Sequence, residues 1–232
     1  MNKKDNNKKI LIFGAGSIGN HFSYAATRLK YEVYITDKSK ISLKRMKNII
    51  YPQRYGQWNS KIIQTDYKKI FSKNKTMFDL VIIGTPPSTH LYLLSKIYNK
   101  IRYKKILIEK PLASIKNNFR EINQYKNQKN LFCGYNHSVS ESFLFFLKKI
   151  QINRKKIKFA KVYWQENWDG ILNAHFWLKD EYGSYLGNYL KGGGALQEHS
   201  HVRKYKPKGA LQVPNIFRCC IYFMLYHSSS AA

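Results

Sequence analysis

Short apolar runs alternate with longer amphipathic stretches through the first 137 residues. The runs that we interpret as strands are Ile10–Phe13, Glu32–Thr36, Lys61–Gln64, Leu80–Ile83, Lys105–Glu109 and Leu131–Tyr135. Apolar spacing between them predicts helices at Ile18–Lys30, Tyr67–Lys73, Thr89–Tyr98 and Lys116–Tyr125. Continuous apolar runs joined by helices are typical of a parallel sheet that is buried on both faces. The sequence therefore predicts an α/β fold, with a doubly wound parallel sheet over residues 1–137.

A second region follows from residue 138. Ser138–Ile150 predicts a helix, and Ile157–Gln165 alternates apolar and polar residues as a strand does. We expect an incomplete α+β substrate or oligomerisation domain over residues 138–201. Residues 202–232 contain no Asp or Glu and hold the adjacent Cys219 and Cys220. Because their character changes abruptly, we interpret them as an atypical tail, produced by a frameshift or premature end shortly after His201.

The chain is strongly basic, with 41 Lys and Arg against 13 Asp and Glu and a formal net charge of +28. Lysines occur along the whole chain among Asn, Ile and Tyr, whose codons are all rich in A and T. We favour codon bias or a solvated face over a nucleic-acid partner, since the densest basic runs lie in no recognisable nucleic-acid motif.

Three cysteines cannot form a disulfide framework, which favours a reducing compartment. No apolar run approaches the ~18 residues of a membrane span, and the N-terminus has no signal-peptide pattern. We therefore expect a cytoplasmic protein without a membrane partner.

Gly14, Gly16 and Gly19 form a G-x-G-x-x-G pattern between the first predicted strand and helix. Gly14 permits a tight turn, Gly16 lets a pyrophosphate approach the backbone, and Gly19 lets the helix pack closely on the sheet. The first helical residues, Ser17 and Ile18, offer N–H groups to the phosphates. The pattern predicts a dinucleotide-binding Rossmann turn.

Asp37 ends the second predicted strand at about the ~20-residue distance expected of a ribose-binding acid. A carboxylate there accepts hydrogen bonds from ribose hydroxyls and repels a 2′-phosphate. We expect NAD or NADP as cofactor, with NAD preferred. Lys38 and Lys40 are able to soften that preference.

Two further loops follow predicted strands. The first contains Thr85, Pro86 and His90, with Ser88 or Thr89 as helix N-cap. Its other interpretation is a stiff loop without a ligand. Glu109 and Lys110 precede Pro111 and end the next strand, which makes Lys110 a candidate proton donor or oxyanion partner.

The last motif runs from Gly192 through two further glycines to Glu198, His199 and His201. A carboxylate and an imidazole on one helix face are able to do acid–base work near neutral pH. A metal site that uses His199, His201 and a tail cysteine is the alternative. It lacks zinc-ligand spacing, so we predict no metal.

Along the chain, the motifs follow one another in the order GAGSIG, Asp37, GTPPSTH, EKP, GYNH and GGGALQEHSH. Together they resemble the Gfo/Idh/MocA family of nicotinamide-dependent oxidoreductases, of the glucose–fructose oxidoreductase and inositol dehydrogenase type. The similarity covers about residues 9–201. It implies reversible hydride transfer between NAD(P) and a secondary hydroxyl of a sugar, cyclitol or nucleotide-linked sugar. It also implies a homo-oligomer, which a truncated second sheet would not build.

The resemblance implies roles for individual residues. Lys110 and His201 match the family's catalytic lysine and acid/base histidine, and Glu198 matches a substrate or orienting carboxylate. The positions that match cofactor-binding residues are Gly14, Gly16, Ser17, Ile18, Gly19, Asp37, Thr85, Pro86, His90, Glu109, Lys110 and Asn136. Trp164, Trp168 and Trp177 either wall a sugar site or form core. Two other functions remain open, a non-catalytic dinucleotide-binding protein and a basic nucleic-acid binder.

Overall fold

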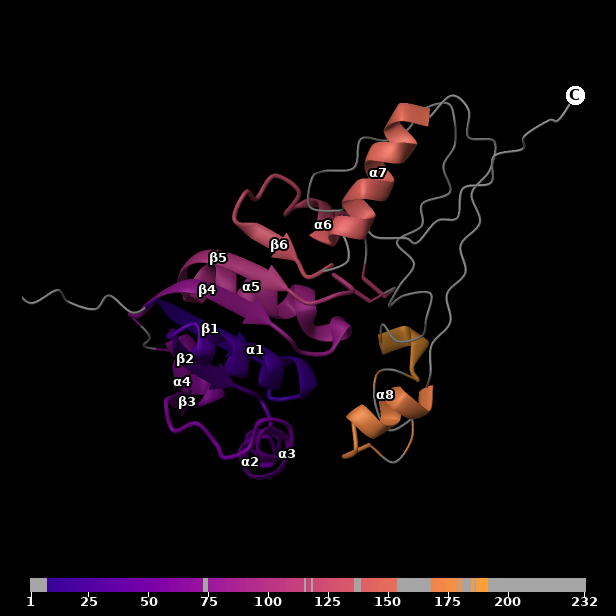
Figure 1. Cartoon of the computed structure of the whole chain (residues 1–232). Helices are drawn as coiled ribbons and strands as arrows, with labels where there is room; N and C mark the ends of the chain where they lie inside the picture. Colours follow the sequence, from indigo (N-terminus) through magenta and orange to yellow (C-terminus); the bar gives the residue numbers. More distant parts are fainter. Residues whose placement is uncertain are drawn as a thin grey trace, which may run out of the picture. The chain divides into compact units, whose positions relative to one another are not determined.

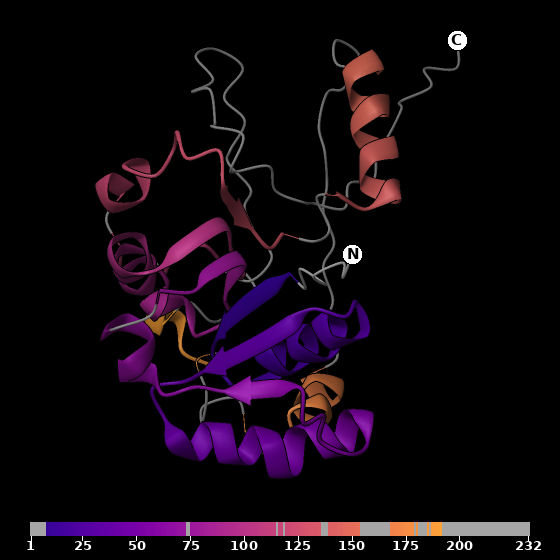
Figure 2. The ribbon, with the colours of Figure 1, turned by 90° about the vertical axis from the view of Figure 1, so that its left-hand side faces the viewer.

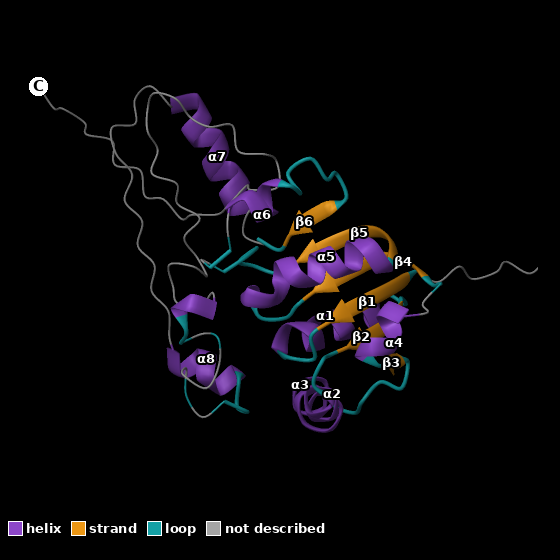
Figure 3. Ribbon diagram, turned by 180° about the vertical axis from the view of Figure 1, so that it is seen from behind, coloured by secondary structure: helices purple, strands orange, loops and turns teal. Residues whose placement is uncertain are grey.

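Six parallel strands form one sheet in the order β3-β2-β1-β4-β5-β6 (Figure 1). They are β1 (Lys9–Phe13), β2 (Glu32–Thr36), β3 (Ile62–Gln64), β4 (Met77–Ile83), β5 (Arg102–Ile108) and β6 (Leu131–Cys133). Figure 3 shows them as arrows that point the same way. This strand order, with its reversal between β1 and β4, confirms the predicted doubly wound Rossmann sheet.

The structure is a computed structural model. It describes residues 8–72, 75–114, 116–117, 119–135, 139–153, 168–178, 180, 185 and 187–191. The chain divides into two units, of which the first comprises Met1–Gly134 and Leu190–Gly192 and the second comprises Tyr135–Tyr189 and Gly193–Ala232.

Helices cover both faces of the sheet. In chain order they are α1 (Ser17–Arg28), α2 (Lys40–Arg45), the π-helical η1 (Met46–Ile50), α3 (Tyr51–Tyr55), α4 (Tyr67–Ser72), the 3₁₀ turn η2 (Pro87–Thr89), α5 (His90–Lys100) and α6 (Phe119–Asn123). Figure 2 shows α1, in indigo, and α5, in magenta, on opposite sides of the strands. Right-handed crossovers produce this arrangement when the strand order reverses.

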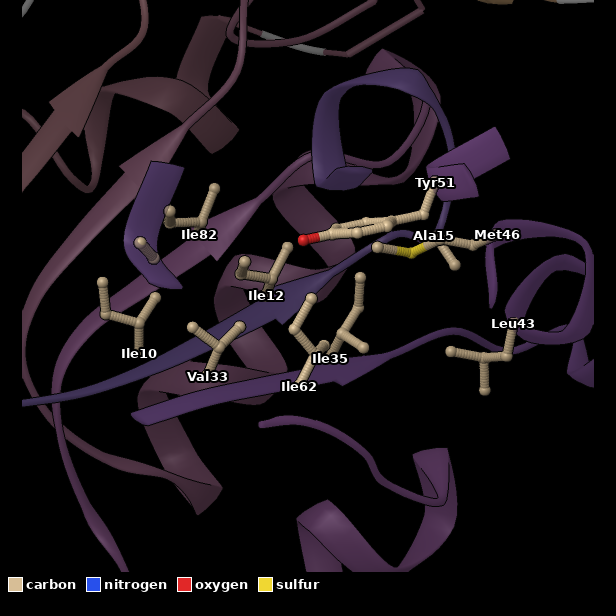
Figure 4. Packing of buried hydrophobic residues seen from close by; sticks show 11 residues of the cluster. Ile10, Ile12, Ala15, Val33, Ile35, Leu43, Met46, Tyr51, Ile62 and Ile82 are labelled. Carbon is tan, nitrogen blue, oxygen red and sulfur yellow. The ribbon is translucent and has the colours of Figure 1, made fainter. Parts of the chain in front are cut away.

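The core is built from the strands that occupy the centre of the sheet. Leu11, Ile12, Val33 and Ile35 have no exposed surface. Ile12, Val33 and Ile35 pack with Met46 and other apolar residues between the sheet and the helical segment that follows β2 (Figure 4). Burial on both faces explains why β1 and β4 are apolar runs rather than alternating ones.

Some element bounds differ from the prediction. β4 begins at Met77 and β5 at Arg102, earlier than the apolar runs indicated, because Met77 pairs with Arg102 in a parallel ladder that polar side chains do not interrupt. The helix predicted at Lys116–Tyr125 covers only Phe119–Asn123.

The helical segment Lys40–Tyr55 was not predicted. Its end signals are nevertheless present in the sequence. The Ser39 hydroxyl accepts a hydrogen bond from the backbone N–H of Ser42, which is an N-cap, and Gly56 ends the segment with a φ of +82°. Apolar spacing alone misses this segment because its middle turns are π-helical.

In the second unit the structure describes α7 (Glu141–Asn153) and α8 (Trp168–Ala174), and the 3₁₀ turn η5 (Tyr189–Lys191) lies at the unit boundary. The helix predicted at Ser138–Ile150 corresponds to α7. The strand predicted at Ile157–Gln165 and the tail after His201 lie outside the described residues. Of the helices in the described ranges, none combines the length and hydropathy needed to cross a membrane.

Candidate dinucleotide site at the carboxyl edge of the sheet

The loops at the carboxyl edge of the sheet begin at one level because each is hydrogen-bonded to the end of a neighbouring strand. The bonds run from Gly14 N to Thr36 O (2.9 Å), Gly84 N to Phe13 O (2.8 Å), Glu109 N to Ile83 O (2.9 Å) and Gly134 N to Ile108 O (2.7 Å). These are the residues at which the predicted motifs start. The sheet therefore brings together four segments that are far apart in the sequence, at the edge where open α/β sheets bind ligands.

The three glycines of the turn have different structural roles. Gly14 has a φ of +105°, and a Cβ there would lie 2.7 Å from Gly84 O. A Cβ on Gly19 would lie 1.8 Å from Gly14 O, so only glycine allows this packing. A Cβ on Gly16 would meet nothing within 4 Å. Gly16 thus borders open space, which a diphosphate would fill.

The helix α1 begins without a capping side chain. Gly16 is its N-cap residue, and the first intrahelical bond runs from Asn20 N to Gly16 O. The N–H groups of the first turn, at Ser17, Ile18 and Gly19, consequently have no acceptor within the helix. No acidic side chain lies in that turn. The partial positive charge of a helix N-terminus is therefore available to an anion.

Asp37 is joined to the glycine turn. Its Oδ2 accepts a hydrogen bond of 2.8 Å from Ala15 N, and its Oδ1 accepts one of 2.8 Å from Ser39 N. The acid at the end of β2 is thereby held beside the turn after β1. A carboxylate has about four acceptor positions, so these two bonds leave room for ribose hydroxyls.

A cavity of about 610 Å³ opens beside Asp37. It is lined by Asp37, Lys38, Lys40, Leu43, Gln64, Thr65, Asp66, Tyr67, Lys68, Tyr92 and Lys96. Its volume suits a ligand of nucleoside size. Four lysines and two aspartates give the lining a net positive charge, which favours an anionic ligand.

The far side of this cavity is formed by the start of α4 and by α5. Asp66 Oδ1 accepts hydrogen bonds from Lys69 N and Lys68 N, and these bonds lower the pKa of Asp66. Burial raises the pKa of Tyr67, and the Asp37 charge raises it further. The Lys96 ammonium lies 5.5 Å from the centre of the Tyr67 ring and 5.4 Å from that of Tyr92. Such cation–π contacts hold a lysine in place at the cavity wall.

Arg54 is a candidate phosphate neighbour that the sequence analysis missed. It lies on α3, and its Nη1 donates to Ser17 Oγ at 2.9 Å and lies 3.0 Å from His21 Nε2. These contacts bring a guanidinium to the first turn of α1. No local sequence signal identifies Arg54, since its place depends on the unpredicted segment Lys40–Tyr55.

The loop after β4 is held by its own hydroxyl groups. Thr85 Oγ1 lies 2.7 Å from Thr89 Oγ1, which in turn donates to Pro86 O at 2.8 Å. Thr89 occupies the N-cap position of α5, but its side chain makes no capping bond. The prediction of Ser88 or Thr89 as N-cap is therefore confirmed at Thr89, whose hydroxyl closes the loop instead of accepting a capping bond.

His90 was expected to line the cofactor cleft. Its side chain is instead fully buried, with Nε2 2.6 Å from Thr85 O and Nδ1 3.0 Å from Pro111 O. A ring with no exposed surface and two occupied nitrogens does not reach a ligand directly. Burial lowers the pKa of His90.

Lys110 follows β5 at the same sheet edge. Its backbone N–H donates to Glu109 Oε2 at 3.2 Å, and its peptide bond to Pro111 is cis. Glu109 lies against Gly134 at the end of β6, where a Cβ would be 2.9 Å from Glu109 Oε1. Glu109 and Lys110 are therefore placed between the ends of β4 and β6.

Residues 8–137 match the family model described as the oxidoreductase family with an NAD-binding Rossmann fold, Gfo/Idh/MocA. The match covers more than half of the chain, and it spans the glycine turn, Asp37 and the loops after β4 and β5. The chain belongs to the Gfo/Idh/MocA family.

No curated protein matches the sequence. Among solved structures, the chain is similar to a myo-inositol dehydrogenase from Corynebacterium glutamicum (18% identity, TM-score 0.48, covering 83% of this chain and 51% of that one). It is also similar to scyllo-inositol dehydrogenase from Lactobacillus casei with NAD(H) and scyllo-inositol (20% identity, TM-score 0.44, covering 68% of this chain and 44% of that one). A third similar structure is the WlbA dehydrogenase from Chromobacterium violaceum in complex with NADH and UDP-GlcNAcA (18% identity, TM-score 0.47, covering 72% of this chain and 47% of that one). The chain spans about half the length of these structures or less.

Three residues singled out by the Gfo/Idh/MocA resemblance, Asn136, Glu198 and His201, lie outside the described residues, as does His199 of the rejected metal site. Trp164 does as well. Trp177 is half-buried, and its ring contacts those of His175 and Phe176 at centroid distances of 5.2 and 5.1 Å.

Proposed function

We propose that the chain binds a nicotinamide dinucleotide across the carboxyl edge of the sheet and acts as a dehydrogenase on a secondary hydroxyl. The observation that carries the proposal is the bond between Asp37 and Ala15 N. It supports a ribose-binding role for Asp37, because Asp37 both lines the cavity and is joined to the turn that contains Gly16. A dinucleotide needs a phosphate site and a nucleoside site in that order.

The residues at the edge have separate tasks in this proposal. The first-turn N–H groups of α1 bind the diphosphate, and Arg54 adds a positive charge beside them. Asp37 binds the adenosine ribose, with the cavity around Tyr67 taking the adenine. The bound nicotinamide cofactor supplies a hydride acceptor or donor.

Lys110 is the proposed proton-transfer residue among those described. Lys110 follows β5 directly, and β5 pairs with β4, so Lys110 lies at the same sheet edge as the loop of Thr85 and Pro86. The nicotinamide end of a dinucleotide would extend from Gly16 towards this edge. Glu198 and His201 complete the proposed acid–base set by resemblance to the family. A sugar or cyclitol is the proposed substrate class.

For the cofactor, we propose that NAD is preferred, because the Asp37 carboxylate repels a 2′-phosphate at close range. Lys38 and Lys40 line the same cavity and offset part of this repulsion. The preference for NAD is therefore expected to be modest, on the order of tenfold in affinity.

The test has two stages. Titration of the protein with NADH, followed by its fluorescence, measures binding. NAD reduction at 340 nm with myo-inositol, scyllo-inositol and UDP-linked sugars then measures turnover. We expect Lys110→Ala to lower turnover by roughly 10²-fold or more, while the exposed control Lys116→Ala leaves it unchanged.

Binding without turnover on any of these substrates would support a non-catalytic dinucleotide-binding protein instead. Failure of the wild-type protein to bind NADH or NADPH at millimolar concentration would overturn the proposal altogether.

A further inference from the structure

The imidazole of His90 is the most completely buried ionisable group that the structure describes at the sheet edge. His90 is the first residue of α5 and follows the 3₁₀ turn η2 directly. Its side chain has an exposed fraction of 0%. A buried polar ring costs stability unless its nitrogens find partners, so the two partners of this ring explain why it is tolerated.

Those partners belong to two different loops. Nε2 lies 2.6 Å from the carbonyl oxygen of Thr85, in the loop after β4. Nδ1 lies 3.0 Å from the carbonyl oxygen of Pro111, in the loop after β5. The His90 ring thus contacts both of the loops that follow the neighbouring strands β4 and β5.

Both loops carry residues of the proposed site. Thr85 begins the loop proposed to line the nicotinamide end, and Pro111 comes directly after Lys110. Proline has no N–H, so its carbonyl is the one backbone group through which Pro111 forms a hydrogen bond. The contact from Pro111 to His90 therefore links the chain after Lys110 to the β4 loop, in addition to the bond from Glu109 N to Ile83 O before Lys110.

Carbonyl oxygens accept hydrogen bonds and do not donate them, so the ring must supply the protons. A neutral imidazole carries one N–H and an imidazolium carries two. Because burial lowers the pKa of His90, the neutral ring predominates at neutral pH and donates to one of the two carbonyls. A phenyl ring of similar size would fill the space but join neither loop.

We infer that His90 is a positioning residue, which sets the place of Lys110 relative to the loop of Thr85 and Pro86. The inference rests on the proposed function, since it concerns the nicotinamide end of the same site. It assigns His90 no contact with cofactor or substrate.

Three variants separate positioning from packing. His90→Phe keeps a ring but removes both ring nitrogens, and with them the N–H that donates to one of the two carbonyls. His90→Gln puts an amide N–H near the position of Nε2 and retains the bond to the Thr85 carbonyl. His90→Asn puts an amide N–H near the position of Nδ1 and retains the bond to the Pro111 carbonyl. For each variant, NADH and ADP-ribose affinities are measured by titration calorimetry and the melting temperature by calorimetry. ADP-ribose has the same adenosine diphosphate but lacks the nicotinamide.

We expect His90→Phe to weaken NADH binding by roughly five- to tenfold, the effect of about one lost hydrogen bond, and to leave ADP-ribose binding within about twofold. His90→Asn, which retains the bond beside Lys110, recovers most of the loss. Should His90→Phe not fold, His90→Gln takes its place, because it too loses the Pro111 bond.

Equal weakening of NADH and ADP-ribose binding would overturn the inference, because it would mean a general loss of structure. Unchanged NADH binding in His90→Phe and His90→Gln would overturn it as well. If wild-type protein binds ADP-ribose but not NADH, the nicotinamide end of the proposed function has failed, and the inference fails with it. If it binds neither, the dinucleotide site itself is wrong.

Discussion

Asp37 Oδ2 and the backbone N–H of Ala15 are joined by a hydrogen bond of 2.8 Å, across 22 positions of sequence. The bond couples the end of β2 to the glycine turn after β1. It holds Asp37, the proposed ribose-binding acid, and the glycine turn, the proposed phosphate site, at one spacing. A site that is ordered in advance loses less conformational entropy on binding.

Replacing this acid should change cofactor choice. We expect Asp37→Ser to raise the ratio of NADPH to NADH affinity by roughly tenfold or more, because the carboxylate no longer repels the 2′-phosphate while Lys38 and Lys40 remain. Fluorescence titration with both cofactors measures the ratio. Asp79→Asn is the matched control, since Asp79 bonds Lys9 N and Lys104 on β5 and does not line the cavity. An unchanged ratio in Asp37→Ser would show that Asp37 does not bind the ribose.

The glycine turn allows binding and folding to be separated. Gly16→Ala adds a methyl group to open space, so we expect stability to change by less than about 1 kcal/mol while NADH affinity falls at least tenfold. Gly19→Ala forces a Cβ against Gly14 O and should cost about 3 kcal/mol or more of folding stability. Urea unfolding and NADH titration of both variants check this. Full NADH affinity in Gly16→Ala would place the diphosphate elsewhere.

Arg54 should act on the phosphates alone. We expect Arg54→Ala to weaken ADP-ribose binding by roughly five- to tenfold and to leave adenosine binding unchanged, because adenosine has no phosphate. Arg54→Lys is expected to recover part of the affinity. If adenosine and ADP-ribose are weakened alike, Arg54 supports α1 instead of the ligand.

His90 should contribute to the pH dependence of stability. Its pKa in the folded state lies below the usual value near 6.5, so the unfolded chain binds the proton more readily. The stabilisation is fully present above about pH 6.5 and is lost as the pH falls towards the lowered folded pKa. The melting temperature should therefore fall more between pH 7.5 and 5.5 in the wild type than in His90→Gln. Equal falls would show that the other histidines account for the effect.

Local sequence patterns predicted most of the strands of the sheet and several residues of the candidate site. The strands of the sheet are apolar runs bounded by glycine, proline or charge, so their positions follow from the solvent preference of short segments. Gly14, Gly16, Gly19 and Asp37 were identifiable because the turn needs glycine at fixed spacing and because β2 must end at the same sheet edge. Asp66 was not predicted, although the same edge rule applies to it because it follows β3 closely.

Tertiary structure decided the rest. Arg54 reaches Ser17 across 37 positions, and His90 reaches Pro111 across 21. No local sequence pattern predicts either pairing. Arg54 meets Ser17 only once the helical segment that follows β2 has packed on α1, and His90 meets Pro111 only once β5 has paired with β4. A histidine either binds a ligand at the surface or forms buried hydrogen bonds, depending on what packs around it. For His90 the sequence supplied the imidazole, and the packing of two loops around it removed it from solvent.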